Sequence, residues 1–217
     1  MYLKTIAELS DGRSPIVIAR VAERLGISPV SANEMMKRLV EQGHITHEPY
    51  KGVLLTEDGR YIAHSVMRRQ RLWEVFLIEQ LKFNWAGIHE AACRLEHATS
   101  KVLAESLAAY LDHPTVCPHG NPIPTADGRL PIVDSRPLNT LKVGETARIL
   151  SIQPTQTDIF AYLNKRNVMP DQIITVIEIA PMQGPITVRL GNAEVALGLT
   201  MAGLIMVGPL QTASLTE

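Results

Sequence analysis

The sequence predicts a mainly α-helical protein with a small amount of β-structure, divided into three folded parts. Apolar residues recur with the helical period through the first half, whereas the last third contains short β-branched runs. Between them, residues 113–141 hold six of the chain's 14 prolines in turn-like runs. These observations predict domains over residues 1–60, 61–125 and 141–217, with a linker over 126–140.

The composition excludes several broad classes of protein. The 217 residues are 46% apolar and can bury a substantial core, and the formal net charge of −1 gives no sign of a polyanion partner. Any nucleic-acid contact must therefore come from a local patch. Two cysteines form no disulfide framework, and no apolar run approaches the roughly 20 residues of a membrane span. We expect a cytoplasmic protein in a reducing compartment, with no membrane partner.

A helix-turn-helix is predicted near the N-terminus, after a first short helix within residues 1–11. Its first helix occupies residues 16–26 and ends at Gly26, where a left-handed backbone suits a helix terminus. Ser28 caps the second helix, which opens with Pro29 at its first position. Two short helices joined by a turn of this length form a helix-turn-helix.

The second helix has an alternative start, because Ser31 and Glu34 have the spacing of a capping box. Three of its apolar residues are expected to face inward: Val30, Met35 and Leu39. Residues 45–56 then alternate partly between apolar and polar and turn at Lys51 and Gly52, which predicts a β-hairpin wing.

A winged helix places its second helix in the major groove of DNA and its wing beside the backbone. Under this interpretation seven residues face DNA: Ser28, Val30, Ser31, Asn33, Glu34, Lys37 and Lys51. Residues 1–60 hold eight basic and eight acidic side chains, so non-specific affinity should be weak and directed phosphate contacts must provide binding. The alternative is a helix-turn-helix used only for packing.

A long helix and a shorter one are predicted after the wing. The long helix starts at Thr56, reaches about Leu81, and carries Gln70 and Glu74 on one face. Three of its arginines either contact phosphate or are solvated, and we favour solvation: Arg68, Arg69 and Arg71. The helix over residues 100–111 turns four apolar residues inward: Val102, Leu103, Leu107 and Leu111. Long apolar helices beyond a winged helix commonly pair subunits, which predicts a homodimer.

A metal-binding pattern lies between these two helices. Four potential ligands share one face of a predicted helix: His89, Cys93, Glu96 and His97. The spacing i, i+3, i+4 can aim the last three at one point, and such nitrogen, oxygen and sulfur donors bind divalent transition metals. The alternative is an amphipathic helix with a buried cysteine and a solvated Glu-His pair.

Cys117 and His119, in the proline-rich stretch, are two further potential zinc ligands. No second pair accompanies them, so a rigid turn is the preferred interpretation.

The last third of the chain has the period of β-structure. Its predicted elements are strands over 146–152, 173–179 and 186–190, a helix over 158–167, and one or two more strands over 193–207. A small antiparallel SH3-like (FeoA-like) β-barrel accommodates them and offers no catalytic constellation.

The order of these elements resembles the diphtheria toxin repressor/manganese transport regulator family of metal-dependent repressors. The resemblance runs without a gap from Met1 to His97, is carried by the His89–His97 motif and by Gly120–Pro124, and extends more loosely through the tail. It implies a metal-activated, dimeric repressor of iron or manganese uptake genes. The implied partner is a palindromic double-stranded operator with half-sites spaced by whole turns of about 34 Å.

The resemblance also implies a primary metal site made of four residues: Met1, Cys93, Glu96 and His97. This mixture of thioether, thiolate, carboxylate and imidazole suits Fe2+ and tolerates Mn2+, Zn2+, Co2+ or Ni2+. Manganese-selective members carry carboxylates at the positions of Met1, Lys4 and Cys93, which favours iron here, although manganese stays open. Relatives begin several residues earlier, so either an upstream start exists or the initiator methionine is retained before the bulky Tyr2.

An ancillary metal site of the family corresponds to four residues here: Gln70, Glu74, His89 and Gln156. A fifth position holds Ile159. Because only Glu74 and His89 are strong ligands, we expect this site to be weak, vacant or rebuilt from the two glutamines, with a sharp loss of affinity.

The implied mechanism is that metal at the primary site ties the first helix to the metal-binding helix and so orders the DNA-binding form. Two alternatives have other consequences. One is a metal-independent winged-helix regulator whose metal is purely structural. The other is a metal-dependent hydrolase using four residues: Glu74, His89, Glu96 and His97. No nucleophile or oxyanion set accompanies them, so we expect neither an enzyme nor a small-molecule substrate.

Overall fold

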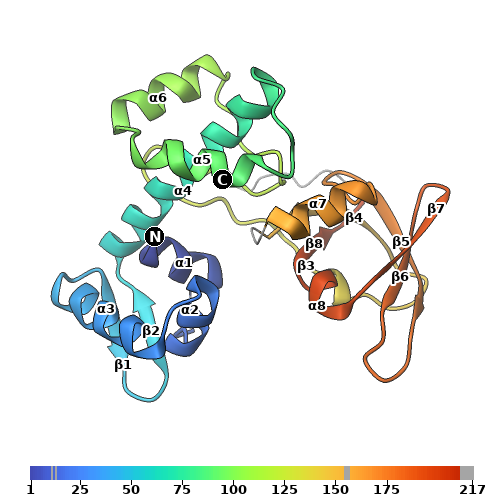
Figure 1. Ribbon diagram of the computed structural model, residues 1–217, viewed down its shortest axis with the longest axis horizontal. Helices are drawn as coiled ribbons and strands as arrows, with labels where there is room; N and C mark the ends of the chain where they lie inside the picture. Colours follow the sequence, from blue (N-terminus) through green and yellow to red (C-terminus); the bar gives the residue numbers. More distant parts are fainter. Residues whose placement is uncertain (11, 13, 154–156, 211–217) are drawn as a thin grey trace. The chain divides into compact units, whose positions relative to one another are not determined.

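Figure 1 shows the computed structural model of the chain, which describes residues 1–10, 12, 14–153 and 157–210. The chain forms two compact units. The first contains Met1–Arg69 and Pro124–Leu130, and the second contains Gln70–Ile123 and the chain from Pro131 onward. Helix α4 (Glu57–Glu79) contributes residues to both units.

The first unit is a winged helix-turn-helix, as the sequence predicts. Its elements are α1 (Tyr2–Leu9), α2 (Ile18–Leu25), α3 (Pro29–Glu41), β1 (Ile45–Glu48) and β2 (Gly52–Leu55). Gly26 follows α2 in the left-handed conformation, with a φ of 65°. Ser28 Oγ accepts a hydrogen bond from Ser31 N at 3.1 Å and caps α3, so the alternative start at Ser31 is not used.

The wing is fastened to the segment that precedes α2. Glu48 pairs with Gly52, so the turn occupies residues 49–51, slightly earlier than predicted. Ile16 N donates to Val53 O at 2.8 Å, and Val53 N donates to Ile16 O at 2.9 Å. Gly52 has a φ of 129°, and a Cβ there would lie 2.1 Å from Ile16 O, so only glycine allows this approach.

The apolar face of α3 differs from the prediction. Val30 is 68% exposed, so the expectation that it faces inward is wrong, and Met35 is only partly buried. The buried residues of α3 are Ala32, Met36 and Leu39. Because α3 begins at Pro29, Val30 falls in its first turn and outside this i, i+4, i+7 face.

The helices of the second unit are the C-terminal part of α4, α5 (Ile88–His97) and α6 (Lys101–Tyr110). Leu107 and Leu111 are buried, as predicted. Val102 and Leu103, also expected to face inward, are 78% and 46% exposed, so that prediction is wrong. The buried face of α6 passes through Ala104, Leu107 and Ala108 and leaves the first-turn residues outside it.

The preferred interpretation that the arginines of α4 are solvated is wrong for Arg71. Its side chain is buried and donates a short hydrogen bond to Pro122 O within the second unit. Arg68, in the first unit, is partly buried and donates to Pro124 O at 2.8 Å. These guanidinium groups therefore hold the proline-rich segment that follows α6.

The C-terminal domain, Arg136–Gly208, is built on a six-stranded antiparallel sheet in the order β3-β8-β4-β5-β6-β7. Its strands are β3 (Arg136–Pro137), β4 (Thr146–Ile152), β5 (Ile173–Ile179), β6 (Ile186–Leu190), β7 (Ala193–Leu197) and β8 (Ile205–Gly208). Helix α7 (Thr157–Lys165) buries Phe160 and Leu163 in the core, and the short η1 (Leu138–Thr140) and α8 (Leu199–Ala202) complete the domain. The bounds of β4, β5 and β6 confirm the three strands predicted there.

Candidate metal centre

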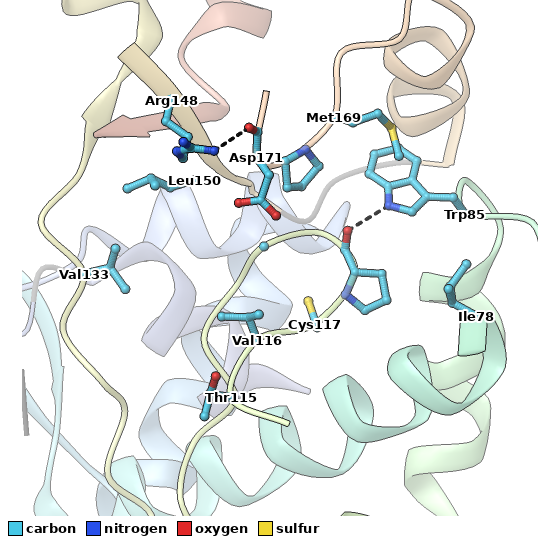
Figure 2. Close-up of a pocket in the computed structure, with 13 residues that line it drawn as sticks. Ile78, Trp85, Thr115, Val116, Cys117, Val133, Arg148, Leu150, Met169 and Asp171 are labelled. Atoms are coloured by element: carbon cyan, nitrogen blue, oxygen red, sulfur yellow. Dashed lines mark hydrogen bonds between the residues drawn. The ribbon is translucent and has the colours of Figure 1, made fainter. Parts of the chain in front are cut away.

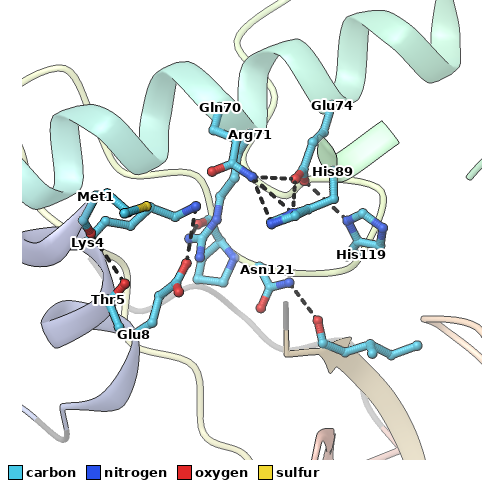
Figure 3. A network of polar contacts seen from close by, with 12 residues as sticks. Met1, Lys4, Thr5, Glu8, Gln70, Arg71, Glu74, His89, His119 and Asn121 are labelled. Atoms are coloured by element: carbon cyan, nitrogen blue, oxygen red, sulfur yellow. Dashed lines mark hydrogen bonds and ion pairs between the residues drawn. The ribbon is translucent and has the colours of Figure 1, made fainter. Parts of the chain in front are cut away.

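Three potential metal ligands converge in the second unit. Glu74 comes from α4, His89 from the first turn of α5, and His119 from the loop after α6 (Figure 3). One ligand atom of each lies within 4.8 Å of the others. His89 Nδ1 is 2.9 Å from Glu74 Oε1, and His119 Nδ1 is 3.2 Å from Glu74 Oε2. We call these three residues the Glu74 cluster.

A glutamine borders the Glu74 cluster one helical turn before the carboxylate. Gln70 Nε2 lies 3.2 Å from Glu74 Oε1 and 3.0 Å from His89 Nδ1. Three of the four residues predicted for the ancillary site are therefore adjacent. The fourth, Gln156, lies outside the described residues.

His119 was not predicted to be a metal ligand here, because its proline-rich surroundings predict a rigid turn. The turn exists, because Gly120 N donates to Cys117 O at 2.8 Å and Gly120 has a φ of 79°. It also directs His119 at Glu74, so His119 joins the two predicted strong ligands, Glu74 and His89, as a third donor. The only sequence signal for a metal ligand here was the presence of Cys117 and His119 two residues apart. The partner of His119 is Glu74, which lies 45 residues earlier in the chain, and no local pattern identifies that contact.

The carboxylate of Glu74 is held in its ionised form. Burial would raise the pKa of Glu74, but hydrogen bonds and positive charge from His119 and His89 outweigh it and hold that pKa well below its usual range. Burial, and then the charge of Glu74, raise the pKa of the neighbouring Cys117 thiol, which therefore stays protonated. One buried carboxylate with two imidazoles is a donor set that suits divalent transition metals.

One polar atom of the cluster is left over. His119 Nε2 is buried and has no hydrogen-bond partner among the described residues. The ring nitrogen that faces Glu74 is Nδ1, so Nε2 is a second, unsatisfied polar atom of the same imidazole, and buried polar atoms normally have partners.

The predicted primary ligands of α5 are not clustered in this way. Cys93, Glu96 and His97, which we call the α5 triad, follow one another on the helix as predicted. Glu96 is buried, whereas the His97 side chain is 68% exposed and its Nδ1 lies 3.8 Å from Glu96 Oε2. In the described part of the chain, only the Glu74 cluster brings three such donors within 4.8 Å.

The fourth predicted primary ligand, Met1, belongs to the first unit and is exposed at the N-terminus of α1. The α5 triad belongs to the second unit. A joint site of Met1 with this triad therefore stays a prediction. The hydrolase alternative is not favoured either, because Glu74 and His89 gather with His119 and not with Glu96 and His97.

The residues predicted to face DNA are all exposed on the first unit. Six lie at or on α3 and one in the wing: Ser28, Val30, Ser31, Asn33, Glu34, Lys37 and Lys51. Lys51 Nζ is 3.2 Å from Glu48 Oε2, and Asn33 Nδ2 donates to Pro29 O at 2.8 Å. None of the described helices is long and apolar enough to cross a lipid bilayer.

Comparison with known families covers most of the chain. Residues 1–53 match the family described as "Iron dependent repressor, N-terminal DNA binding domain", and residues 56–125 match "Iron dependent repressor, metal binding and dimerisation domain". Residues 136–209 match the FeoA domain, which agrees with the predicted SH3-like fold.

Individual relatives agree with these matches. The chain is 32% identical to the iron-dependent repressor IdeR of Mycobacterium tuberculosis (strain CDC 1551 / Oshkosh), over 95% of each chain. It is 29% identical to the diphtheria toxin repressor of Corynebacterium diphtheriae, over 91% of this chain and 90% of that one. Its fold is similar to that of a manganese-dependent transcriptional repressor solved with manganese, with a TM-score of 0.88, 33% identity, and coverage of 96% and 98%.

Proposed function

The chain belongs to the diphtheria toxin repressor/manganese transport regulator family of metal-dependent transcriptional repressors, and we propose that it represses iron or manganese uptake genes. It is a metal-activated DNA-binding repressor with a dimerisation domain. We place it in the cytoplasm, bound as a homodimer to a palindromic operator. Two recognition helices per dimer would read half-sites separated by whole turns of about 34 Å.

The observation that carries this proposal is the Glu74 cluster. An ionised carboxylate held between two imidazoles, in the segment matched to a metal-binding domain, is a donor set that suits a divalent cation. The exposed polar face of α3 supports the other half of the proposal, because a DNA-reading helix must present its side chains to solvent when free.

We assign the regulatory metal to Met1 and the α5 triad. The thioether of Met1 and the thiol of Cys93 are soft donors, so Fe2+ suits this set better than a site made of carboxylates, with Mn2+ as the alternative. The metal would tie α1 to α5. It activates only through its preference for the DNA-competent form, and a roughly 10²- to 10⁴-fold preference, or about 3–5 kcal/mol, suffices.

We assign a second ion to the Glu74 cluster, with Gln70 and the undescribed Gln156 as further candidate ligands. His119 adds a second imidazole to the set, which offsets the weak donor Gln70. Glu74 supplies the negative charge, and the two imidazoles supply directional nitrogen donors.

The test is anaerobic titration of Fe2+ or Mn2+ into the protein with a fluorescent fragment of its own promoter. Wild type should bind the fragment at least about 100-fold more tightly with metal, because the ion selects the DNA-competent form. Cys93→Ala should lose this gain. Glu90→Gln, an exposed change on the same helix, is the matched control and should keep it.

Two results would contradict the proposal: DNA affinity that does not respond to metal, or a Cys93→Ala variant that responds as wild type does. Removing metal with a chelator separates the structural-metal alternative, because unfolding would then accompany loss of DNA binding. We expect the circular dichroism of the folded protein to survive chelation.

A further inference from the structure

The Glu74 cluster lies against the C-terminal domain, and the contact between them is aromatic. We propose that Phe160 of α7 couples metal binding at the Glu74 cluster to the docking of the C-terminal domain on the helices. This inference rests on the proposed metal site and adds that docking of the C-terminal domain regulates metal binding there. Phe160 contacts a ligand residue, so it is a positioning residue.

Phe160 is fully buried and fixes the ring of His119. The two rings stack with centroids 4.2 Å apart and planes inclined by 29°. Trp85 closes the group, 4.8 Å from the His119 ring and 5.3 Å from the Phe160 ring. The His89 ring lies 6.2 Å from Phe160. Stacking fixes the plane of an imidazole and therefore the directions in which its nitrogens can bind a metal.

The backbone of the His119 loop lies directly on β4. Ile152 N donates to His119 O at 2.9 Å. Asn121 Nδ2 donates to Ile152 O at 2.9 Å, which is the dashed line drawn from Asn121 in Figure 3. A Cβ on Gly120 would lie 1.9 Å from Leu150 O, so no other residue allows this approach. The backbone that carries His119 therefore cannot shift without disturbing the contact with the C-terminal domain.

The other side of the same loop is open. A cleft of about 500 Å³ separates the helices from the C-terminal domain there, with Ile78, Val116 and Leu150 among its walls (Figure 2). Trp85 Nε1 donates to Pro118 O at 2.9 Å at the edge of this cleft. The contacts of this loop with the C-terminal domain include the His119–Phe160 stack and the hydrogen bonds with Ile152, so an ion that holds His119 can bias docking.

Coupling follows from linkage. An ion that needs the docked orientation of His119 binds the docked form more tightly, and docking is strengthened by the same factor. Removing the aromatic ring of Phe160 should lower the metal affinity by about tenfold, which corresponds to the interaction energy of a buried aromatic pair. The C-terminal domain then takes part in metal sensing through the aromatic ring of Phe160, whether or not Gln156 is also a ligand.

The experiment uses the full chain carrying Cys93→Ala, so that added Co2+ reports on the Glu74 cluster. Hydrogen exchange of the Ile152 amide measures docking, because that N–H donates to His119 O. Co2+ should slow this exchange in the parent chain. With Phe160→Leu added, we expect Co2+ affinity to fall about tenfold and most of the metal-induced protection to disappear.

Leu163→Val is the matched control, because Leu163 is equally buried on the same helix and loses a similar volume. It should keep both Co2+ affinity and protection. If Phe160→Leu unfolds the domain, seen as loss of protection in β5 and β6, Gly120→Ala takes its place. That variant keeps every donor and Phe160 but disturbs the contact with Leu150 O, and it should also lose the metal-induced protection.

Wild-type Co2+ affinity and protection in a folded Phe160→Leu variant would overturn the coupling, and so would equal losses in Leu163→Val. Co2+ that binds without slowing Ile152 exchange would overturn it too, although the metal site would stand. Glu74→Gln tests the metal site separately from the coupling. Unchanged Co2+ binding in that variant would mean that the assignment of a metal site to the Glu74 cluster is wrong.

Discussion

The two groups of metal-type residues in the second unit differ in how they are assembled. The Glu74 cluster takes its donors from α4, α5 and the loop after α6, and tertiary packing has already brought them together. The α5 triad stands on one helix, and its predicted fourth ligand comes from the other unit.

A preassembled site and an unassembled one serve different purposes. In the docked form, an ion entering a preassembled site moves its ligands little and gains affinity, because the cost of ordering the ligands was met during folding. An ion that must gather ligands from two units favours the conformation in which they meet, and that preference is what a switch needs. We therefore expect regulation at the α5 triad and stabilisation at the Glu74 cluster.

The largest expected effect tests that division directly. With saturating Fe2+, Cys93→Ala should reduce operator affinity by about 100-fold or more, because the switch is lost. Glu74→Gln should reduce it by less than about tenfold, because the second site acts through docking. Fluorescence anisotropy under anaerobic conditions measures both. Equal losses in the two variants would remove the distinction.

The second effect tests whether the Glu74 cluster is held in place by the loop contact. Gly120→Ala combines a left-handed φ with a collision against Leu150 O and should lower the free energy of unfolding by about 3 kcal/mol. Gly191→Ala has a φ of 56° but open space around it and should cost about 1 kcal/mol. Urea denaturation gives both values, and similar costs would show that the loop yields easily.

The third effect concerns the two cysteines: Cys93 belongs to the α5 triad, and Cys117 lies next to the Glu74 cluster. Cys93 is partly exposed, whereas burial raises the pKa of the Cys117 thiol and keeps it protonated. Alkylation at pH 8 should therefore modify Cys93 at least about 100-fold faster. Metal should protect Cys93 if it binds the α5 triad. Mass spectrometry of the peptides follows both rates, and a fast-reacting Cys117 would contradict the buried site.

The smallest effect tests whether metal affinity depends on the overall charge of α5 or only on its metal-ligating side chains. Glu90 forms an exposed ion pair with Arg94, at 3.2 Å and four residues apart. Glu90→Gln should change the free energy of unfolding by less than about 0.5 kcal/mol and metal affinity by less than about twofold. Thermal unfolding and metal titration measure these changes, and a larger loss would mean that overall charge contributes to metal binding.

Local patterns predicted most of the elements and failed where tertiary contacts decide. The strands β4, β5 and β6 have the bounds that their β-branched alternation indicates, because that signal is contained within each strand. Val30 and Val102 are apolar yet exposed, because which face of a helix is buried depends on the partner it packs against.

The candidate site shows the same limit. Glu74 and His89 were predicted because the resemblance to the repressor family assigns ancillary metal ligands to their positions. His119 was missed because its role arises from a loop that folds back on α4 and is seated on β4. No pattern within that loop indicates either contact.

The bond between the wing and the segment before α2 has a consequence for how such a repressor can be controlled. With Ile16 and Val53 paired, Gly52 packed on the Ile16 carbonyl, and Met36 and Leu39 of α3 in the same core cluster, the wing and the helix-turn-helix form one DNA-binding unit. Control of DNA binding by a dimer with two such units must therefore act on the separation and the relative angle of the units. An operator with altered spacing between half-sites should therefore mimic the effect of withdrawing the metal.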